Sequence, residues 1–204
     1  MSRTQLLIAT TNEGKLRELR PMLSDLPFEL VGLTDFSNLQ TVAETGSTFV
    51  ENAILKARGY SKQAALLTLA DDSGLQIEAL GGAPGVLSAR FLGGAVAYAE
   101  RNAVLLAALK EKSNRSSRFV CAVAIAACDG GLVRVFEKTC EGRIADSARG
   151  SGGFGYDPIF IPAEYDQTFG ELTAETKNRI SHRARAIKAA REYLATLTRA
   201  QTAR

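Results

Sequence analysis

The chain has 204 residues, of which 46% are hydrophobic and 23% are charged. These fractions exclude a disordered chain, and the length suits one globular domain, or at most two small lobes that share one core. The net charge of +3 is too small to require nucleic acid as a partner, and no run of like charges forms a basic arm.

The cysteines and the N-terminus bear on the cellular compartment. Cys121, Cys128 and Cys140 are an odd number without C-x-x-C spacing, so we interpret them as small core residues of a protein in a reducing compartment. The first residues contain only a brief apolar run, which predicts neither a signal peptide nor a membrane span. We therefore expect a cytoplasmic protein.

A strand, a polar loop and a helix follow one another near the N-terminus. Residues 5–9 predict a short strand, and the apolar spacing over residues 16–23 predicts a helix that Pro21 kinks or shortens. The residues between them, 10–15, combine hydroxyls, an amide and a lysine with the free N–H groups of a helix start, which suits a phosphate. The alternative is an ordinary strand-to-helix turn that Asn12 caps.

A second strand is expected over residues 28–33, and a second helix begins near residue 48. Thr48 and Glu51 form a capping box, and an apolar stripe follows it. Glu44, just before this helix, is either a metal ligand or a solvated loop residue. Lys56 lies away from much of the stripe and either reaches a phosphate or faces water.

The central stretch carries the strongest chemical signal. The apolar run 66–70 is followed by Asp71 and Asp72 and then by Ser73-Gly74, so we expect a buried strand that ends there and presents carboxylates at the rim of a sheet. Adjacent side chains of a strand point to opposite faces, so the two aspartates are expected to separate. The glycines of residues 81–85 are expected to turn the chain and bring Arg90 near the carboxylates.

Further along, a helix is predicted over residues 98–110 and a buried hairpin over residues 119–136. Gly150, Gly152 and Gly155 formally satisfy G-x-G-x-x-G, but a strand is expected after them instead of a helix, so we reject a dinucleotide-binding site. We interpret the segment as a loop that approaches a ligand closely, with an aromatic surface for a base; the alternative is a mobile turn.

The last segment predicts a helix that Ser181 caps. His182, the only histidine, and Arg183 lie in its first turn, where N–H donors would meet an anion or a carbonyl oxygen. The alternative for a lone histidine at a cap is a structural role.

Together these segments resemble the inosine triphosphate pyrophosphatase family, the XTP/dITP diphosphatases that cleanse nucleotide pools. The motifs occur in the order expected and run from residue 10 to residue 183. They are TTNEGK at 10–15, ETGSTFVENAILKA at 44–57, ADDSGL at 70–75, GGAPG at 81–85 with SAR at 88–90, GGFGYDP at 152–158, Lys177, and SHR at 181–183.

The resemblance implies an α/β fold with an elongated mixed sheet flanked by helices, and two lobes with a central nucleotide cleft, over residues 1–204 as a single nucleoside triphosphate pyrophosphatase domain. It implies Mg²⁺ as cofactor, a homodimer, and no nucleic-acid or membrane partner. Asp72 would be the proton acceptor and, with Glu44, a metal ligand that Asp71 supports. Lys56 and Arg90 would be secondary candidates for phosphate or base. The implied substrate-binding residues are Thr10, Thr11, Asn12, Glu13, Gly14, Lys15, Ser73, Phe154, Gly155, Tyr156, Asp157, Lys177, His182 and Arg183.

The implied reaction is Mg-dependent hydrolysis of ITP, dITP and XTP to the monophosphate and pyrophosphate, which suits a carboxylate that deprotonates water. A first rival is a related pyrophosphatase that prefers pyrimidine or modified nucleotides. A second rival is a nucleic-acid-binding module. Its basic face would consist of Arg179, Arg183, Arg185, Lys188 and Arg191.

Overall fold

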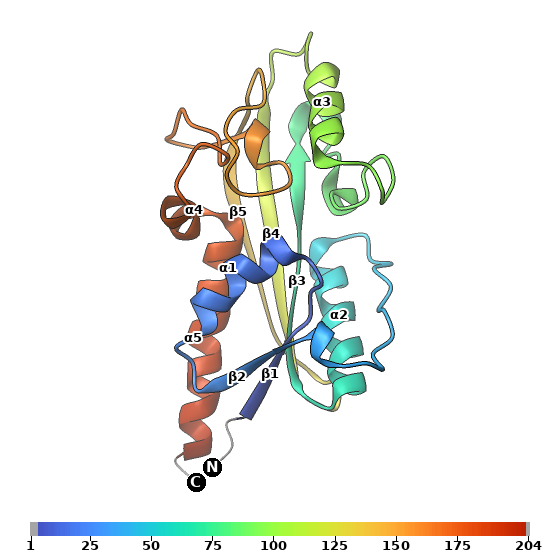
Figure 1. Cartoon of the computed structure of the whole chain (residues 1–204), viewed down its shortest axis with the longest axis vertical. Coiled ribbons are helices and arrows are strands. Elements are labelled where there is room, and N and C mark those ends of the chain that lie inside the picture. The colour runs from blue at the N-terminus through green and yellow to red at the C-terminus, as the bar shows by residue number, and fades with distance from the viewer. Residues whose placement is uncertain (1–3, 203–204) are drawn as a thin grey trace. The chain divides into compact units, whose positions relative to one another are not determined.

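A computed structural model of the chain describes residues 4–202 (Figure 1). Residues 1–3, the start of the segment from which we predicted no signal peptide, lie outside the described residues. No helix in the described part combines the length and the hydropathy that a membrane span needs. The helices and strands are β1 (Thr4–Ile8), α1 (Glu13–Leu23), β2 (Phe28–Gly32), α2 (Phe49–Ala64), β3 (Leu67–Ile77), α3 (Tyr98–Ala108), β4 (Ser116–Ala126), β5 (Leu132–Ile144), β6 (Phe160–Pro162), α4 (Ala174–Ile180) and α5 (His182–Thr202).

The six strands form one mixed sheet in the order β2-β1-β3-β4-β5-β6. Strand β1 pairs in parallel with β2 and with β3, whereas β5 pairs antiparallel with β6. The predicted α/β class with a mixed sheet flanked by helices is therefore confirmed.

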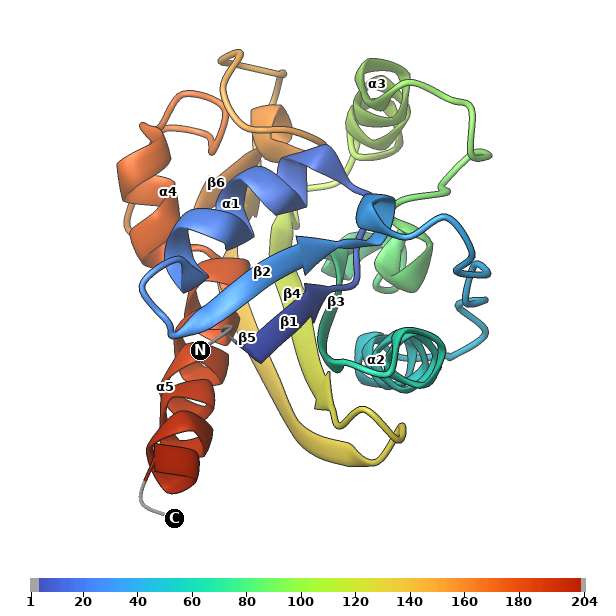
Figure 2. The ribbon, with the colours of Figure 1, turned by 60° about the horizontal axis from the view of Figure 1, so that its bottom comes forward.

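The chain divides into two compact units. The first contains the chain up to Asp72, residues 121–138 and the chain from Arg183 onward. Its core lies where α1 and α5 cover one face of the sheet, with Leu19, Leu69, Val123 and Ile187 fully buried. Helix α2 lies against the other face (Figure 2). Two opposed helical layers thus enclose the first part of β3.

The second unit contains residues 73–120 and 139–182. Its core is aromatic: the ring of Phe119 lies 4.7 Å from that of Phe160 and 6.0 Å from that of Phe169, and Tyr156 is buried in the same cluster. Strands β3, β4 and β5 each contribute residues to both units.

Strand β3 differs from its prediction. It does not end at the aspartates but continues to Ile77, so Asp71 and Asp72 lie inside a strand and not at the rim of the sheet. The reason is Gly74. A Cβ atom there would lie 2.3 Å from Ser88 Oγ and 2.6 Å from the Gly85 carbonyl oxygen, so this glycine permits a close approach and does not form a turn.

Other predictions were wrong in part. Cys121 and Cys140 are buried as expected, but Cys128 is exposed in the β4-β5 turn and is no core residue. The helix predicted after Ser181 is present as α5, which begins at His182. Helix α4 was not predicted: Thr173 caps it through the Thr176 N–H, and it ends where the chain becomes extended at Ser181. Pro21 lies inside α1, which continues to Leu23, the last residue of the predicted apolar pattern, so Pro21 does not shorten the helix before that point.

Candidate functional site

The loop between β1 and α1 has the geometry expected of a capped helix start. The Asn12 side chain accepts a hydrogen bond from the Lys15 N–H at 3.0 Å, and the Thr10 hydroxyl accepts one from the Asn12 N–H at 3.2 Å. Thr11 and Glu13 are exposed and Gly14 is buried. The prediction that Asn12 caps the helix is confirmed, whereas phosphate binding by this loop stays a prediction.

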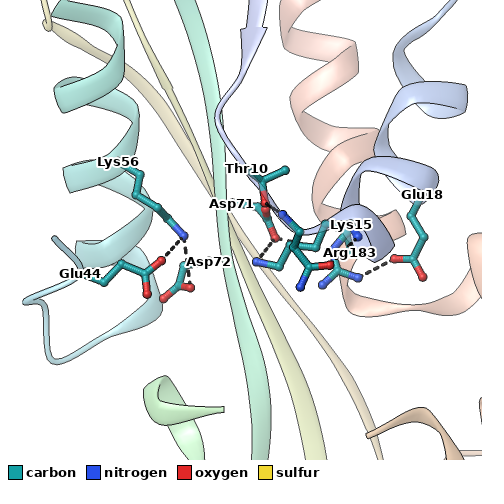
Figure 3. Close-up of polar contacts among 9 residues, drawn as sticks. Thr10, Lys15, Glu18, Glu44, Lys56, Asp71, Asp72 and Arg183 are labelled. Carbon is teal, nitrogen blue, oxygen red and sulfur yellow. Dashed lines mark hydrogen bonds and ion pairs between the residues drawn. The ribbon is translucent and has the colours of Figure 1, made fainter. Parts of the chain in front are cut away.

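Lys15 directs its side chain at one of the two central carboxylates. Its Nζ lies 2.8 Å from Asp71 Oδ2, and Arg183 Nε lies 3.5 Å from the same oxygen. Arg183 Nη1 also donates to Glu18 at 2.5 Å. Figure 3 shows this group on one side of β3.

Asp71 is held as a carboxylate by these cations. Burial raises the pKa of its carboxyl, but Lys15, Arg183 and Lys56 lower it further than burial raises it, and the net pKa is about 2. Burial likewise opposes the charge of Arg183, yet Glu18 and Asp71 raise the pKa of its guanidinium above the usual range. Asp71 is therefore ionised near neutral pH.

Asp72 occupies the opposite side of β3, as the alternation along a strand predicted (Figure 3). Lys56 Nζ lies 2.6 Å from Glu44 Oε1 and 3.4 Å from Asp72 Oδ1. The Asp72 Oδ2 atom is buried and has no hydrogen-bond partner among the described residues. The structure thus brings together Glu44, Lys56 and Asp72, which come from a loop, a helix and a strand.

The protonation of this second group differs from that of Asp71. Burial raises the pKa of Asp72, Lys56 and Lys15 oppose it, and the neighbouring carboxylates Glu44 and Asp71 add to the rise, so the pKa lies above its ordinary value. Burial lowers the pKa of Lys56, but Asp72, Asp71 and Glu44 raise it more. Lys56 therefore remains protonated, and Asp72 is the carboxylate that takes up a proton more readily.

Asn52 is a residue of this site that the sequence reasoning missed. It is fully buried on α2, and its Oδ1 accepts a hydrogen bond from the Gly46 N–H at 2.8 Å, which fixes the segment that carries Glu44. The Tyr60 hydroxyl accepts a further hydrogen bond from the Val42 N–H at 3.3 Å. The signal in the sequence was the position of Asn52 one turn before Lys56, on the same helix face.

The glycine-rich loop of the second unit is built around a buried ion pair. Lys177 Nζ lies 2.5 Å from Asp157 Oδ2, and the Phe154 N–H donates to the same oxygen at 2.7 Å. The Lys177 ammonium also lies 4.8 Å from the centre of the Phe154 ring. The structure thus brings together three predicted substrate residues, and Tyr156 is buried beside them.

His182 is 2% exposed and stacks on Phe119 with ring centres 4.6 Å apart and planes inclined by 7°.

Ser73 lies on β3, and Arg90 is half-buried in the turn after residues 85–87, within the second unit. The expected approach of Arg90 to the carboxylates stays a prediction.

The basic face of the nucleic-acid rival is interrupted. Arg183 is 3% exposed and paired with carboxylates, so it does not belong to a surface patch. Arg191 is paired with Asp25. The other three residues, Arg179, Arg185 and Lys188, are exposed, so the predicted face of five is reduced, which weakens this rival.

Two carboxylates are the donors that the structure offers to a metal. Among the described residues no group of three or more His, Cys, Asp or Glu side chains could hold an ion. Glu44 and Asp72 nevertheless fit Mg²⁺, which takes oxygen ligands and is commonly held by one or two carboxylates plus substrate phosphates. The buried Asp72 Oδ2 atom, without a hydrogen-bond partner among the described residues, is an oxygen that such an ion would satisfy.

The fold is that of an α/β protein, a mixed sheet with helices on its faces. Its charged site lies on the inner strand β3, whose two aspartates pair with lysines of the neighbouring helices. The chain belongs to the Ham1 family, whose model matches residues 6–193. This confirms the resemblance that the motifs indicated.

Relatives of similar length support the same assignment. A dITP/XTP pyrophosphatase of Desulforamulus reducens is 45% identical over 192 residues, which cover 93% of this chain and 95% of the relative. A protein of that name from Geobacillus kaustophilus is 47% identical over 185 residues, 90% of each chain.

Solved structures agree in fold. A HAM1 protein from Coxiella burnetii matches with a TM-score of 0.87 and 42% identity, and the match covers 95% of this chain and 99% of that chain. A nucleoside-triphosphatase / dITP/XTP pyrophosphatase from Mycobacterium abscessus matches with a TM-score of 0.74 and 43% identity, over 92% and 98% of the chains.

Proposed function

We propose that this chain hydrolyses ITP, dITP and XTP to the nucleoside monophosphate and pyrophosphate in the presence of Mg²⁺. The relatives support the coarser statement, that the chain is a nucleoside triphosphate pyrophosphatase, a hydrolase. The observation that carries the finer proposal is the state of the Asp72 carboxylate. It is buried, and one of its oxygens has no hydrogen-bond partner among the described residues. Its other oxygen lies near the Lys56 ammonium, which also pairs with Glu44.

Asp72 is the proposed proton acceptor. Its buried carboxylate, with one oxygen unpartnered among the described residues, can orient a water molecule and take its proton during attack on the α-phosphorus. Mg²⁺, held by Asp72 and Glu44, would supply positive charge to the phosphate oxygens. Lys56 keeps its proton and adds positive charge at the same place.

The loop of residues 10–15 is proposed to bind the triphosphate. Its exposed hydroxyl at Thr11 and the N–H groups at the start of α1 are donors, and Lys15 adds a charge whose present partner is Asp71. Asp71 is then an anchor for Lys15 and Arg183, not a second base, because its pKa is too low for it to accept a proton near neutral pH.

The nucleoside end is proposed to bind at the glycine-rich loop with Ser73, Lys177, His182 and Arg183. Phe154 offers a ring for stacking, and the 6-oxo group of hypoxanthine or xanthine accepts a hydrogen bond from His182 or Arg183. The 6-amino group of adenine would leave such a donor unpaired, and mismatches of this kind discriminate strongly. We also propose that the protein is cytoplasmic and forms a homodimer, as the resemblance implies. Sedimentation of the purified protein would test the homodimer.

Substrate profiling tests the proposal. Purified protein is incubated with Mg²⁺ and, separately, with ITP, dITP, XTP, GTP, ATP and dTTP, and pyrophosphate and orthophosphate are both measured. We expect pyrophosphate from the inosine and xanthosine nucleotides and little from ATP or dTTP. Asp72→Asn should fold and lose nearly all turnover. Asp146→Asn, a change of equal charge at a side chain that is 92% exposed, should retain it.

Other products would point elsewhere. Orthophosphate as the main product would contradict cleavage between the α- and β-phosphates. A preference for dTTP or modified pyrimidines would favour the first rival, and salt-dependent binding of nucleic acid without hydrolysis would favour the second.

A further inference from the structure

Arg101, in the first turns of α3, is one of the most deeply buried side chains of the second unit. It is 2% exposed, and an arginine is almost never buried unless its donors are paired. Its Nη1 donates to the Ala89 carbonyl at 2.7 Å and, more weakly, to that of Ser88 at 3.4 Å. Its Nη2 donates to the Gly93 carbonyl at 2.9 Å and, at 3.5 Å, to that of Gly94.

The segment that Arg101 holds is a strained turn. Leu92 has a φ of +63° and Gly93 a φ of +108°, and side-chain-bearing residues rarely adopt the left-handed region. The turn closes on itself through the Gly93 N–H, which donates to the Arg90 carbonyl at 2.8 Å. Carbonyls from both sides of this turn converge on one guanidinium, so Arg101 fixes the backbone on either side of Arg90.

The same helix surface also reaches the glycine-rich loop. Asn102 Nδ2 donates to the Gly155 carbonyl at 3.2 Å, and the Tyr156 hydroxyl donates to the Ser88 carbonyl at 2.8 Å. Tyr98 packs edge-on against Tyr156 with ring centres 5.2 Å apart, and the Arg101 guanidinium lies 4.7 Å from the Tyr98 ring centre. The Ser88 carbonyl therefore joins the turn that Arg101 holds to the loop of residues 154–157.

The link through Tyr156 does not depend on pH in the working range. Burial raises the pKa of the Tyr156 hydroxyl most, Tyr98 raises it further, and Arg101 only partly opposes them. The hydroxyl thus keeps its proton and remains a donor to Ser88.

We propose that Arg101 is a positioning residue for nucleotide selection: it holds residues 88–94 and, through the Ser88 carbonyl and Tyr156, the loop 154–157 that contacts the nucleoside. Arg101 touches no reacting atom in this role. The proposal rests on the proposed function, because loop 154–157 is assigned to the nucleoside there. A purely structural arginine would contribute to stability alone.

The test compares Arg101→Met, which removes all donors, with Arg101→Lys, which keeps the charge but not the planar fork. Val104→Ala, at a 40% exposed position of the same helix, is the matched control. Amide hydrogen exchange of the ligand-free proteins measures how firmly residues 88–94 and loop 154–157 are held. Steady-state kinetics with dITP and dATP measure the preference between the two nucleotides.

For Arg101→Met we expect exchange in residues 89–94 and 154–157 to rise about tenfold or more, while α2 and β1 keep wild-type exchange. We expect KM for dITP to rise about tenfold with kcat within about threefold, and the preference for dITP over dATP to fall, because loosened positioning weakens binding more than chemistry. Arg101→Lys should give exchange rates and KM values between those of the wild type and Arg101→Met. Val104→Ala should match the wild type in both.

Two results would overturn the inference. One is a lower melting temperature with unchanged KM and unchanged preference; the other is unchanged exchange in loop 154–157. If Arg101→Met does not fold, Tyr156→Phe removes the link to Ser88 and should loosen loop 154–157 while residues 89–94 stay protected. A wild-type protein that does not hydrolyse dITP would refute the proposed function instead, and hydrogen exchange would still decide whether Arg101 holds both loops.

Discussion

Neutralising Asp71 should destabilise the protein by an amount that depends on pH. Asp71 is 1% exposed and faces Lys15 and Arg183, so its ionised form is stabilised by the fold. The pKa of Asp71 falls from 3.8 to about 2 on folding. At about 1.4 kcal/mol per pKa unit, this fall corresponds to about 2.5 kcal/mol of stability at neutral pH.

Because folding lowers the pKa of Asp71, the stability that this carboxylate contributes falls as the pH falls. A carboxyl whose pKa is lower in the folded state stabilises the fold fully above its unfolded pKa, and this stabilisation is lost as the pH falls through the folded pKa. Asp71→Asn lacks the titrating group. The difference in unfolding free energy between wild type and variant should therefore be about 2.5 kcal/mol at pH 7 and should shrink between about pH 4 and pH 2.

Urea unfolding of both proteins over this pH range measures the difference. Asp146→Asn is the control: it removes an exposed partner of Arg115 and should change stability by less than about 1 kcal/mol at every pH. A loss of less than about 1 kcal/mol for Asp71→Asn at pH 7, or an equal loss at pH 7 and pH 2, would contradict stabilisation of the fold by the ionised Asp71 carboxylate.

Two further substitutions probe the second unit. His182→Ala should lower kcat/KM for ITP more than for ATP, because only the 6-oxo base loses a donor; equal losses in a steady-state assay would contradict its role in base recognition. Gly153→Ala should lower stability by more than about 1 kcal/mol in thermal unfolding, since the residue has a left-handed φ. Its φ is +69°, and a Cβ there would lie 2.0 Å from Asp157 Oδ2. Gly94→Ala, where no atom lies within 4 Å of the added Cβ, should be nearly neutral, and similar losses in both would show that the close contact is unimportant.

Features set by neighbouring residues were predictable from the sequence. The Asn12 cap of α1 and the capping box of Thr48 and Glu51 on α2 are present as expected, because each depends on a side chain and a backbone N–H three residues apart. The β4-β5 turn is likewise local: the Ala127 N–H donates to the Gly131 carbonyl at 2.8 Å.

Features set by distant contacts were not predictable. Gly74 resembles a turn residue in the sequence, but it lies in a strand because Ser88 approaches it from a segment that follows 14 positions later. Lys56 was expected to face a phosphate or water. It is 9% exposed, and its ammonium pairs with Glu44 and Asp72. These carboxylates lie 12 and 16 positions away in the chain, so no local sequence pattern predicts the pairing.

The two adjacent aspartates show how the fold separates roles that the sequence leaves equivalent. Asp71 meets two cations on its side of β3, and its pKa is about 2, so it cannot exchange protons near neutral pH. Asp72 meets one lysine that it shares with another carboxylate, and its pKa is raised. Perturbed groups with a specific charge partner are the usual candidates for chemistry. Because alternation along one strand gives neighbouring carboxylates different surroundings, Asp71 is suited to anchor cations, and Asp72 is the one of the two that we propose as proton acceptor.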